Sequence, residues 1–192
     1  MTRTIKSFIF GTSFLALASA SQAVLITFDD AQTNGNAIGS FYSGLGVTFT
    51  DAQWTDNFSL TGASGAQGVS SISQGFNPSA TNPITATFSG TTSFVTLRGI
   101  DVGTQGFRLK AYNSSNTLID NQVVFGSGVG IGQFFDLTVN GAIAKIEFMQ
   151  DNAGDGSDGM LFENMQFDAV PEPGSMVVLA LGGLALLRRR KK

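Results

Sequence analysis

The chain contains no cysteine and no histidine among its 192 residues. Without cysteine no disulfide can form, so an exported fold would have to be held by its core or by metal ions. The same absences exclude Ser-His-Asp and Cys-His catalysis and remove the commonest soft metal ligands. Any chemistry must therefore come from carboxylates, amides, hydroxyls and aromatic rings.

Positive charge is scarce in the middle of the chain. Of the 11 lysines and arginines, two lie before residue 24 and five lie at 188–192, which leaves four between these ends. Thirteen of the 14 acidic residues lie in the same middle part, so its formal charge is 4 − 13, or −9. Binding to nucleic acid or to an anionic membrane surface needs cationic patches, so we expect neither. The charge is compatible with cation binding.

The first 23 residues have the three-part pattern of a secretory signal peptide. Arg3 and Lys6 supply positive charge, residues 8–17 form a short apolar stretch, and small residues precede a cleavage site after Ala23. Cleavage after Ala20 is an alternative. An uncleaved anchor helix is disfavoured, because the apolar stretch is shorter than the roughly 18 residues of a spanning helix.

A second apolar run of 14 residues without a charge lies near the C-terminus, at 174–187. As a helix it would be about 21 Å long, which is short for a hydrocarbon core of about 30 Å. Directly after it comes a basic tail of Arg188, Arg189, Arg190, Lys191 and Lys192. Cations of this kind stay in the cytoplasm, so the body of residues 24–169 would lie on the far side of the membrane.

The segment before this run reads Val-Pro-Glu-Pro and ends at Pro173. The order of Pro-Glu-Pro, short apolar helix and basic tail resembles the PEP-CTERM sorting signal of exopolysaccharide-producing Gram-negative bacteria, and Pro171, Glu172 and Pro173 match its motif. The resemblance implies that residues 170–192 are recognised by an exosortase and cut near the motif, so that the transmembrane helix 174–187 anchors the protein only transiently. A plain membrane anchor with a coincidental Pro-Glu-Pro is the alternative.

The body has short runs of alternating apolar residues separated by Gly, Asn, Asp and Ser, which is typical of an all-β fold. One apolar and one polar face on these runs predicts antiparallel sheets packed as a β-sandwich, with most of the phenylalanines in its core. Compact turns are expected at 113–116 and at Asn140-Gly141, and long loops within 51–83. The predicted strands are 24–29, 45–50, 69–74, 84–89, 93–102, 106–112, 117–125, 133–139, 142–150 and 160–168.

Two stretches resemble the opening and closing strands of the jelly-roll domains found in this exported family. The first is "LITFDD" with "YSGL" further on, and the second is "FENMQF", in which Glu163 stands where the family usually has Asp. The resemblance implies a jelly-roll-like sandwich in which the first and last strands are neighbours.

Calcium is the cofactor that these acids suit best, because carboxylate and amide oxygens are its preferred ligands. The loop "DNAGDGSDG" at 151–159 offers Asp155 and Asp158, although it is not an EF-hand. By alternation Glu163 shares an apolar face with Leu161, Met165 and Phe167, and Asp30 continues the face of Ile26 and Phe28. If the first and last strands are adjacent, Asp30 and Glu163 converge on one structural cation; otherwise both lie at strand ends in water.

Trp54 is the only tryptophan, and it either stacks on a sugar ring or packs in the core. We expect a non-catalytic structural or adhesive protein of the cell surface or extracellular matrix. The alternatives are a carbohydrate-binding module for exopolysaccharide, which needs an aromatic platform or a groove lined by Asn and Asp, and a carboxylate-only glycoside hydrolase, which needs two acids flanking a cleft. The expected partners are an exosortase, exopolysaccharide and, before processing, the membrane.

Overall fold

The computed structural model describes residues 22–60, 62–152 and 159–168. Residues 1–21 of the predicted signal peptide and the whole predicted sorting signal lie outside these residues. Apart from one short 3-10 turn, η1 (Ser43–Leu45), the regular structure that is described is β-strand. The strands are β1 (Ala23–Ile26), β2 (Val47–Thr50), β3 (Ala52–Asp56), β4 (Gln67–Ser71), β5 (Ile84–Ile100), β6 (Phe107–Tyr112), β7 (Leu118–Val124), β8 (Phe134–Gln150) and β9 (Leu161–Asp168).

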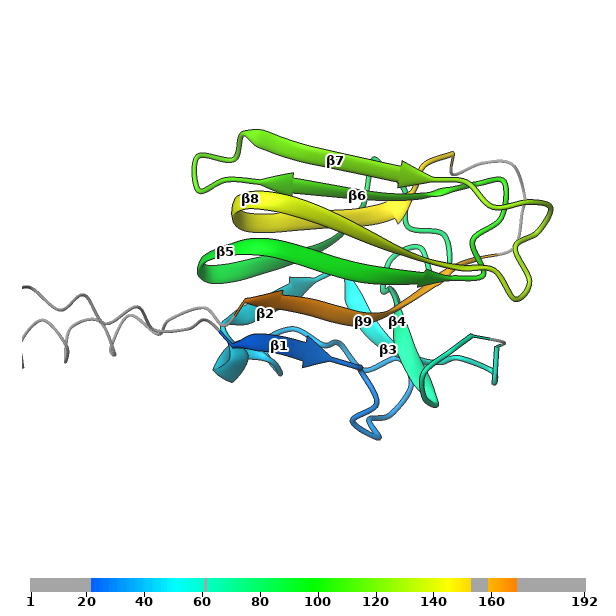
Figure 1. Ribbon diagram of the computed structural model, residues 1–192. Helices are drawn as coiled ribbons and strands as arrows, with labels where there is room; N and C mark the ends of the chain where they lie inside the picture. Colours follow the sequence, from blue (N-terminus) through cyan, green and yellow to red (C-terminus); the bar gives the residue numbers. More distant parts are fainter. Residues whose placement is uncertain (1–21, 61, 153–158, 169–192) are drawn as a thin grey trace, which may run out of the picture.

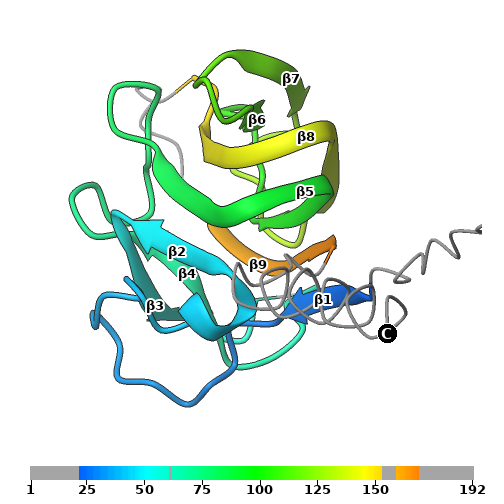
Figure 2. The same ribbon diagram turned by 90° about the vertical axis from the view of Figure 1, so that its left-hand side faces the viewer.

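The strands form two packed layers. Their order is β3-β4-β9-β5-β8-β6-β7, with β1 added to β9 and β2 added to β5, and every pair is antiparallel. One layer contains β5, β6, β7 and β8, and β9 lies with β1 to β4 in the other (Figure 2). The predicted all-β antiparallel sandwich is confirmed.

Strands β5 and β8 are longer than predicted, because each joins two expected strands. They pair from Ile84↔Phe148 to Ile100↔Phe134, with register shifts between Thr87 and Phe94 where both strands bend. The first half of β5 pairs with β2 and the second half with β9, so this strand links the two layers.

The compact turn predicted at Asn140-Gly141 is wrong. Asn140 lies inside β8 and pairs with Phe94 of β5. Its backbone N–H donates to the Asp120 carboxylate of β7 at 2.8 Å. Because β5 pairs with Asn140 on one side and Asp120 of β7 binds its N–H, the chain continues as a strand here instead of turning. Gly141 marks the bend, with a φ of 132° that residues with a side chain rarely adopt.

The region 51–83 contains more structure than predicted. The stretch Ala52–Asp56 forms β3, which pairs with β4 from Ala52↔Ser71 to Asp56↔Gln67. In this stretch only Ala52 and Trp54 follow the apolar alternation of a strand. Two apolar residues are too few to distinguish a strand from a loop by sequence.

The core is rich in phenylalanine, but only half of the described phenylalanines are in it. Phe162 of β9 is fully buried and lies edge-on to Phe107 and Phe148, with ring centroids 5.4 and 4.8 Å apart. The expectation that most phenylalanines are buried was too broad, since five are exposed: Phe41, Phe58, Phe76, Phe125 and Phe134.

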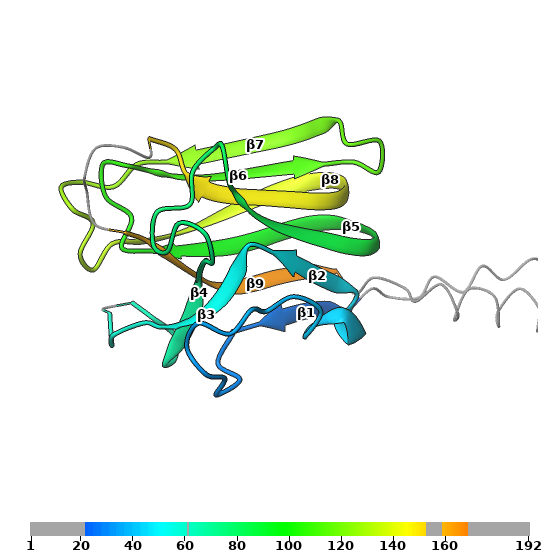
Figure 3. The ribbon, with the colours of Figure 1, turned by 180° about the vertical axis from the view of Figure 1, so that it is seen from behind.

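The two ends of the described body lie side by side. Strand β1 pairs with β9 from Ala23↔Asp168 to Ile26↔Met165, as expected for the first and last strands. We call this end, with the turns at 88–93 and 113–117, the tether end; Figures 1 and 3 show it with the start of β1 and the tip of β9. Residues 57–60, 72–83, 101–106 and 125–133 form the opposite, distal end.

Strand β1 also bears on the predicted cleavage site. Ala23, the last residue of the expected signal peptide, is already part of the strand. Cleavage after Ala20 would keep its pairing with Asp168, and cleavage after Ala23 would remove it.

We predict that Phe162→Ala lowers the free energy of unfolding by about 3–5 kcal/mol, because it removes a buried ring that its neighbours cannot replace. The melting temperature should fall by about 10 °C or more. Phe58→Ala is the matched control, since this side chain is 67% exposed and should change stability by no more than about 0.5 kcal/mol. Thermal unfolding of both variants tests this, and equal effects would contradict it.

Candidate functional site

A β-bulge in β9 decides where Glu163 points. Arg98 pairs with Glu163, but Thr96, two residues earlier in β5, pairs with Gln166, so β9 contains one extra residue. Asn164 has a φ of 51°, and asparagine tolerates this left-handed conformation better than most residues. The bulge lets residues on either side of it face the core.

The predicted face of Glu163 is therefore wrong. Phe162, Met165 and Phe167 all belong to the core cluster, and Glu163 does not share their face. Simple alternation fails here because the bulge at Asn164 shifts the phase of the strand by one residue.

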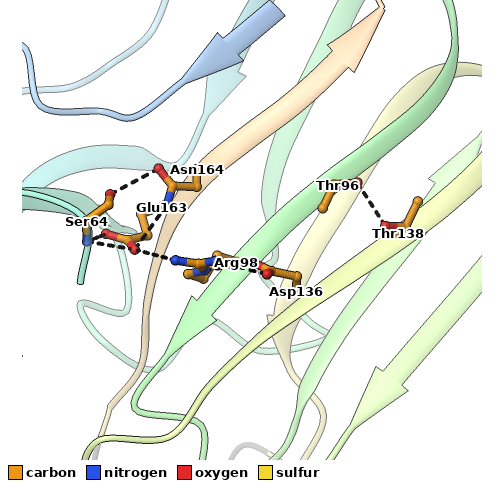
Figure 4. Close-up of polar contacts among 7 residues, drawn as sticks. All are labelled: Ser64, Thr96, Arg98, Asp136, Thr138, Glu163 and Asn164. Atoms are coloured by element: carbon orange, nitrogen blue, oxygen red, sulfur yellow. Dashed lines mark hydrogen bonds and ion pairs between the residues drawn. The ribbon is translucent and has the colours of Figure 1, made fainter. Parts of the chain in front are cut away.

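Glu163 is nevertheless fully buried, with 0% of its surface exposed. The backbone N–H of Ser64 donates to both carboxylate oxygens at 3.0 Å, and the Asn164 amide lies 3.4 Å from Oε1. The Ser64 hydroxyl donates to the Asn164 side-chain oxygen at 3.0 Å. These contacts hold the chain around Ser64 against the outer side of β9 (Figure 4).

Arg98 of β5 lies between two acids. Its guanidinium donates to both Asp136 oxygens, from Nε at 2.8 Å and from Nη2 at 3.0 Å, and its Nη1 lies 3.8 Å from Glu163 Oε1. It also stacks 5.2 Å from the centre of the Phe134 ring. The hydrogen bonds that Arg98 donates to Asp136 raise the pKa of Arg98 further, so this side chain stays charged. Figure 4 shows the row Asp136, Arg98, Glu163 across three neighbouring strands.

Asp29 is the second acid that approaches Glu163. Its Oδ1 accepts the backbone N–H groups of Ala66 and Gln67 at 2.8 and 3.0 Å. A Cβ on Gly65 would lie 2.0 Å from the Asp29 carboxylate, so only glycine lets the chain pass this close. The backbone N–H groups of Ser64, Ala66 and Gln67 thus bind two carboxylates.

The pKa of Glu163 is raised above its ordinary value. Burial is the largest cause, because it disfavours the charged form, and the negative charge of Asp29 acts in the same direction. Hydrogen bonds from Ser64 and the charge of Arg98 lower the pKa but do not compensate fully.

Asp30 lies apart from this network. It accepts a hydrogen bond from the Tyr42 hydroxyl, whose pKa is raised by burial first and by Asp30 second. The alternation that placed Asp30 beside Ile26 ends with β1, because Phe28 has a φ of 66°. Asp29, which follows the opening strand, is therefore the acid that acts on Glu163, rather than Asp30.

The predicted calcium ligands are not gathered in the described part of the chain. Within residues 22–60, 62–152 and 159–168, no group of three or more acidic side chains could hold a metal ion. Asp155 and Asp158 lie outside the described residues, so calcium at that loop stays a prediction.

Trp54 is in the core and not on the surface. It is 2% exposed, and its ring packs edge-on against Phe41 with centroids 4.9 Å apart. Of the two alternatives for Trp54, the structure favours packing in the core, because neighbouring rings cover the indole. The sequence analysis did not predict the two partners of Glu163, Ser64 and Arg98. Arg98 could have been noticed as one of only four cations in the body, whereas Ser64 carried no signal.

Comparison with known protein families identifies a sorting signal at the C-terminus. Residues 169–191 match the family model described as the PEP-CTERM protein-sorting motif, which confirms the predicted sorting signal. The chain is thus an exported protein that is processed at the membrane by an exosortase. Among the described residues no helix has the length and apolar character needed to cross a bilayer, and the predicted helix 174–187 lies outside them.

Solved structures with a similar fold are distant. The K2 cleaved adhesin domain of Lys-gingipain is 16% identical (TM-score 0.46) over 76% of this chain and 97% of that one. The C-terminal CBM6 of a marine laminarinase from Zobellia galactanivorans is 11% identical (TM-score 0.39) over 77% of this chain and 99% of that one. A family 29 carbohydrate-binding module is 11% identical (TM-score 0.43) over 77% of this chain and 90% of that one. The search of curated proteins returned no match. At these identities no function is transferred to this chain.

We predict opposite pH effects for two acids. The folded-state pKa of Glu163 is raised, so its ionisation destabilises the fold as pH rises through and above the ordinary glutamate value, 4.5. The difference in melting temperature, Glu163→Gln minus unmodified protein, should therefore increase from pH 4 to pH 7.

Glu147 is the control for this pair. Although burial acts to raise its pKa, hydrogen bonds from Tyr112 and Lys145 lower it, so its ionisation stabilises the fold. Glu147→Gln should lose stability relative to the unmodified protein over the same pH range. Thermal unfolding in a buffer series measures both, and slopes of the same sign would refute the assignment.

Proposed function

We propose that this protein is a non-catalytic structural or adhesive domain, displayed at the cell surface or in the extracellular matrix from one end. One observation carries the proposal. Ala23 pairs with Asp168, so both ends of the body lie at the tether end, and the sorting motif begins one residue later, at 169. Any attachment through the C-terminal signal would therefore hold the tether end and leave the distal end free.

The distal end has the composition of an interaction surface. Exposed apolar side chains are scattered singly on most soluble proteins, but gathered patches are typical of contact surfaces. The distal segments contain the exposed side chains Phe58, Ile72, Phe76, Phe125, Val129 and Ile131, and the rings of Phe58 and Phe76 have their centroids 6.1 Å apart. This gathering supports an adhesive role.

The acid network favours a structural role over hydrolysis. A glycoside hydrolase needs two carboxylates on either side of a cleft that the substrate can enter. Glu163 is fully buried with both oxygens bonded to Ser64, and the Arg98 guanidinium lies between it and Asp136. The network therefore fastens the segment around Ser64 onto β9 and offers no acid pair to a substrate.

We predict that replacing Pro171, Glu172 and Pro173 together by alanine blocks processing. The full chain should then keep its C-terminal tail and stay in the membrane fraction, because an exosortase would no longer recognise the motif. Mass spectrometry of the protein and membrane fractionation measure this. A variant that is still shortened and released would contradict the role of the motif.

We predict that the distal end is more accessible than the tether end on intact cells. The natural chain has no cysteine, so single substitutions can be labelled cleanly with a membrane-impermeant maleimide. Ser127 belongs to the distal segment 125–133. Ser43 begins η1, which lies beside the turn 88–93 of the tether end because the Ser89 N–H donates to the Gly46 carbonyl directly after η1; both serines are exposed. In the chain with its sorting motif intact, Ser127→Cys should react at least about fivefold faster.

The purified protein is the control for this labelling. In detergent solution, where no cell surface covers the tether end, the two cysteines should react at similar rates. Equal rates on cells, or faster labelling at position 43, would contradict display from the tether end.

A further inference from the structure

A groove of about 510 Å³ opens at the tether end, away from the acid network. One wall is the bend of β5 around residues 87–91, and the other is the turn between β6 and β7 at 113–116. Figure 1 shows both at the same end of the sandwich. The side chains that carry hydrogen-bonding groups in its lining are Thr87, Ser89, Thr91, Asn113, Ser114, Asn116 and Lys145.

Backbone hydrogen bonds preform both walls. In the bend, the N–H of Ser89 donates to the Gly46 carbonyl at 2.9 Å. In the turn, the Asn113 side-chain oxygen accepts the N–H groups of Ser115 and Thr117 at 3.0 and 2.9 Å. The Asn113 oxygen is thus used by the turn, which leaves its amide N–H groups to offer to a ligand. A ligand would meet fixed walls and would not have to order them.

The charge of the groove excludes several ligands. None of its described lining residues is acidic, so it is not a cation site. Its single cation, Lys145, is already bonded to Glu147 at 2.9 Å and lies 4.1 Å from the centre of the Tyr112 ring. An anion would have to compete with Glu147 for this charge and approach a body of formal charge −9.

A neutral, hydroxyl-rich chain fits what remains. Hydroxyl and amide side chains donate and accept hydrogen bonds without charge, as the hydroxyl groups of a sugar do. A volume of about 510 Å³ is within the range of small-molecule sites. We propose that this groove binds a neutral polysaccharide chain of the extracellular matrix; the inference rests on the proposed function, which places the protein there.

Asn116 gives the sharpest test of the groove. It is exposed and has a φ of 57°, a conformation in which glycine is at least as comfortable as asparagine. Asn116→Gly therefore deletes the amide and keeps the turn. Combined with Ser114→Ala, it removes two polar groups from one wall without touching Lys145 or the core.

The experiment is affinity electrophoresis of the full chain in detergent, in native gels containing exopolysaccharide of the producing strain. The polysaccharide is separated beforehand into neutral and acidic fractions by anion exchange. The control variant, Asn36→Ala with Ser40→Ala, changes the same two residue types at exposed positions outside the groove.

We expect the neutral fraction to retard the unmodified protein and the control variant alike. The Ser114→Ala, Asn116→Gly variant should bind it at least about fivefold more weakly, with an unchanged melting temperature. Equal retardation of both variants, retardation by the acidic fraction alone, or retardation by neither fraction would overturn the inference. The maleimide labelling on cells is independent of these results, so display from the tether end can hold where the groove fails.

Discussion

Strand β9 must satisfy two environments at once, and most of the structure depends on how it does so. It pairs with β1, β4 and β5, so it joins the first strand of the body to the centre of the sandwich. One side places Phe162, Met165 and Phe167 in the core. The other side carries Glu163, a group that is costly to bury while charged. The bulge at Asn164 makes both possible by shifting the strand by one residue.

The burial of Glu163 explains the segment that covers it. A buried carboxylate needs hydrogen bonds and an opposite charge, and these come from the Ser64 backbone and from Arg98. Asp136 in turn fixes the guanidinium on its exposed side by two parallel hydrogen bonds. Because burial and Asp29 still raise the pKa of Glu163, the network specifies where the covering segment lies more than it stabilises the fold.

The pairing of β1 with β9 divides the molecule into two ends with different chemistry. At the tether end, next to the sorting signal, the lining of the groove includes several hydroxyl and amide side chains. The distal segments contain exposed phenylalanines and aliphatic side chains, of which Phe58 and Phe76 lie against each other. A neutral sugar chain held near the attachment point and an apolar surface held away from it would together suit a component of a cell-surface matrix.

Local pattern by itself determined the all-β class, most strands and the sorting signal. The alternation in Phe107–Tyr112 needs only neighbouring residues to be recognised, and Pro171 to Pro173 need only their order before an apolar run and a basic tail. The lack of cysteine and histidine likewise limits the chemistry through composition alone. The resemblance to jelly-roll domains correctly placed the first strand beside the last.

Tertiary structure alone decided the rest, because those features depend on residues far apart in the sequence. The bend that carries Asn140 and Gly141 through β8 requires β5 and Asp120, and the burial of Trp54 requires Phe41 and the neighbouring strand β4. Glu163 was singled out from the sequence, but its environment comes from Ser64, 99 positions earlier, and from Arg98 on another strand. Alternation along one strand cannot reveal a bulge or the segment that covers it, since both are set by contacts across strands.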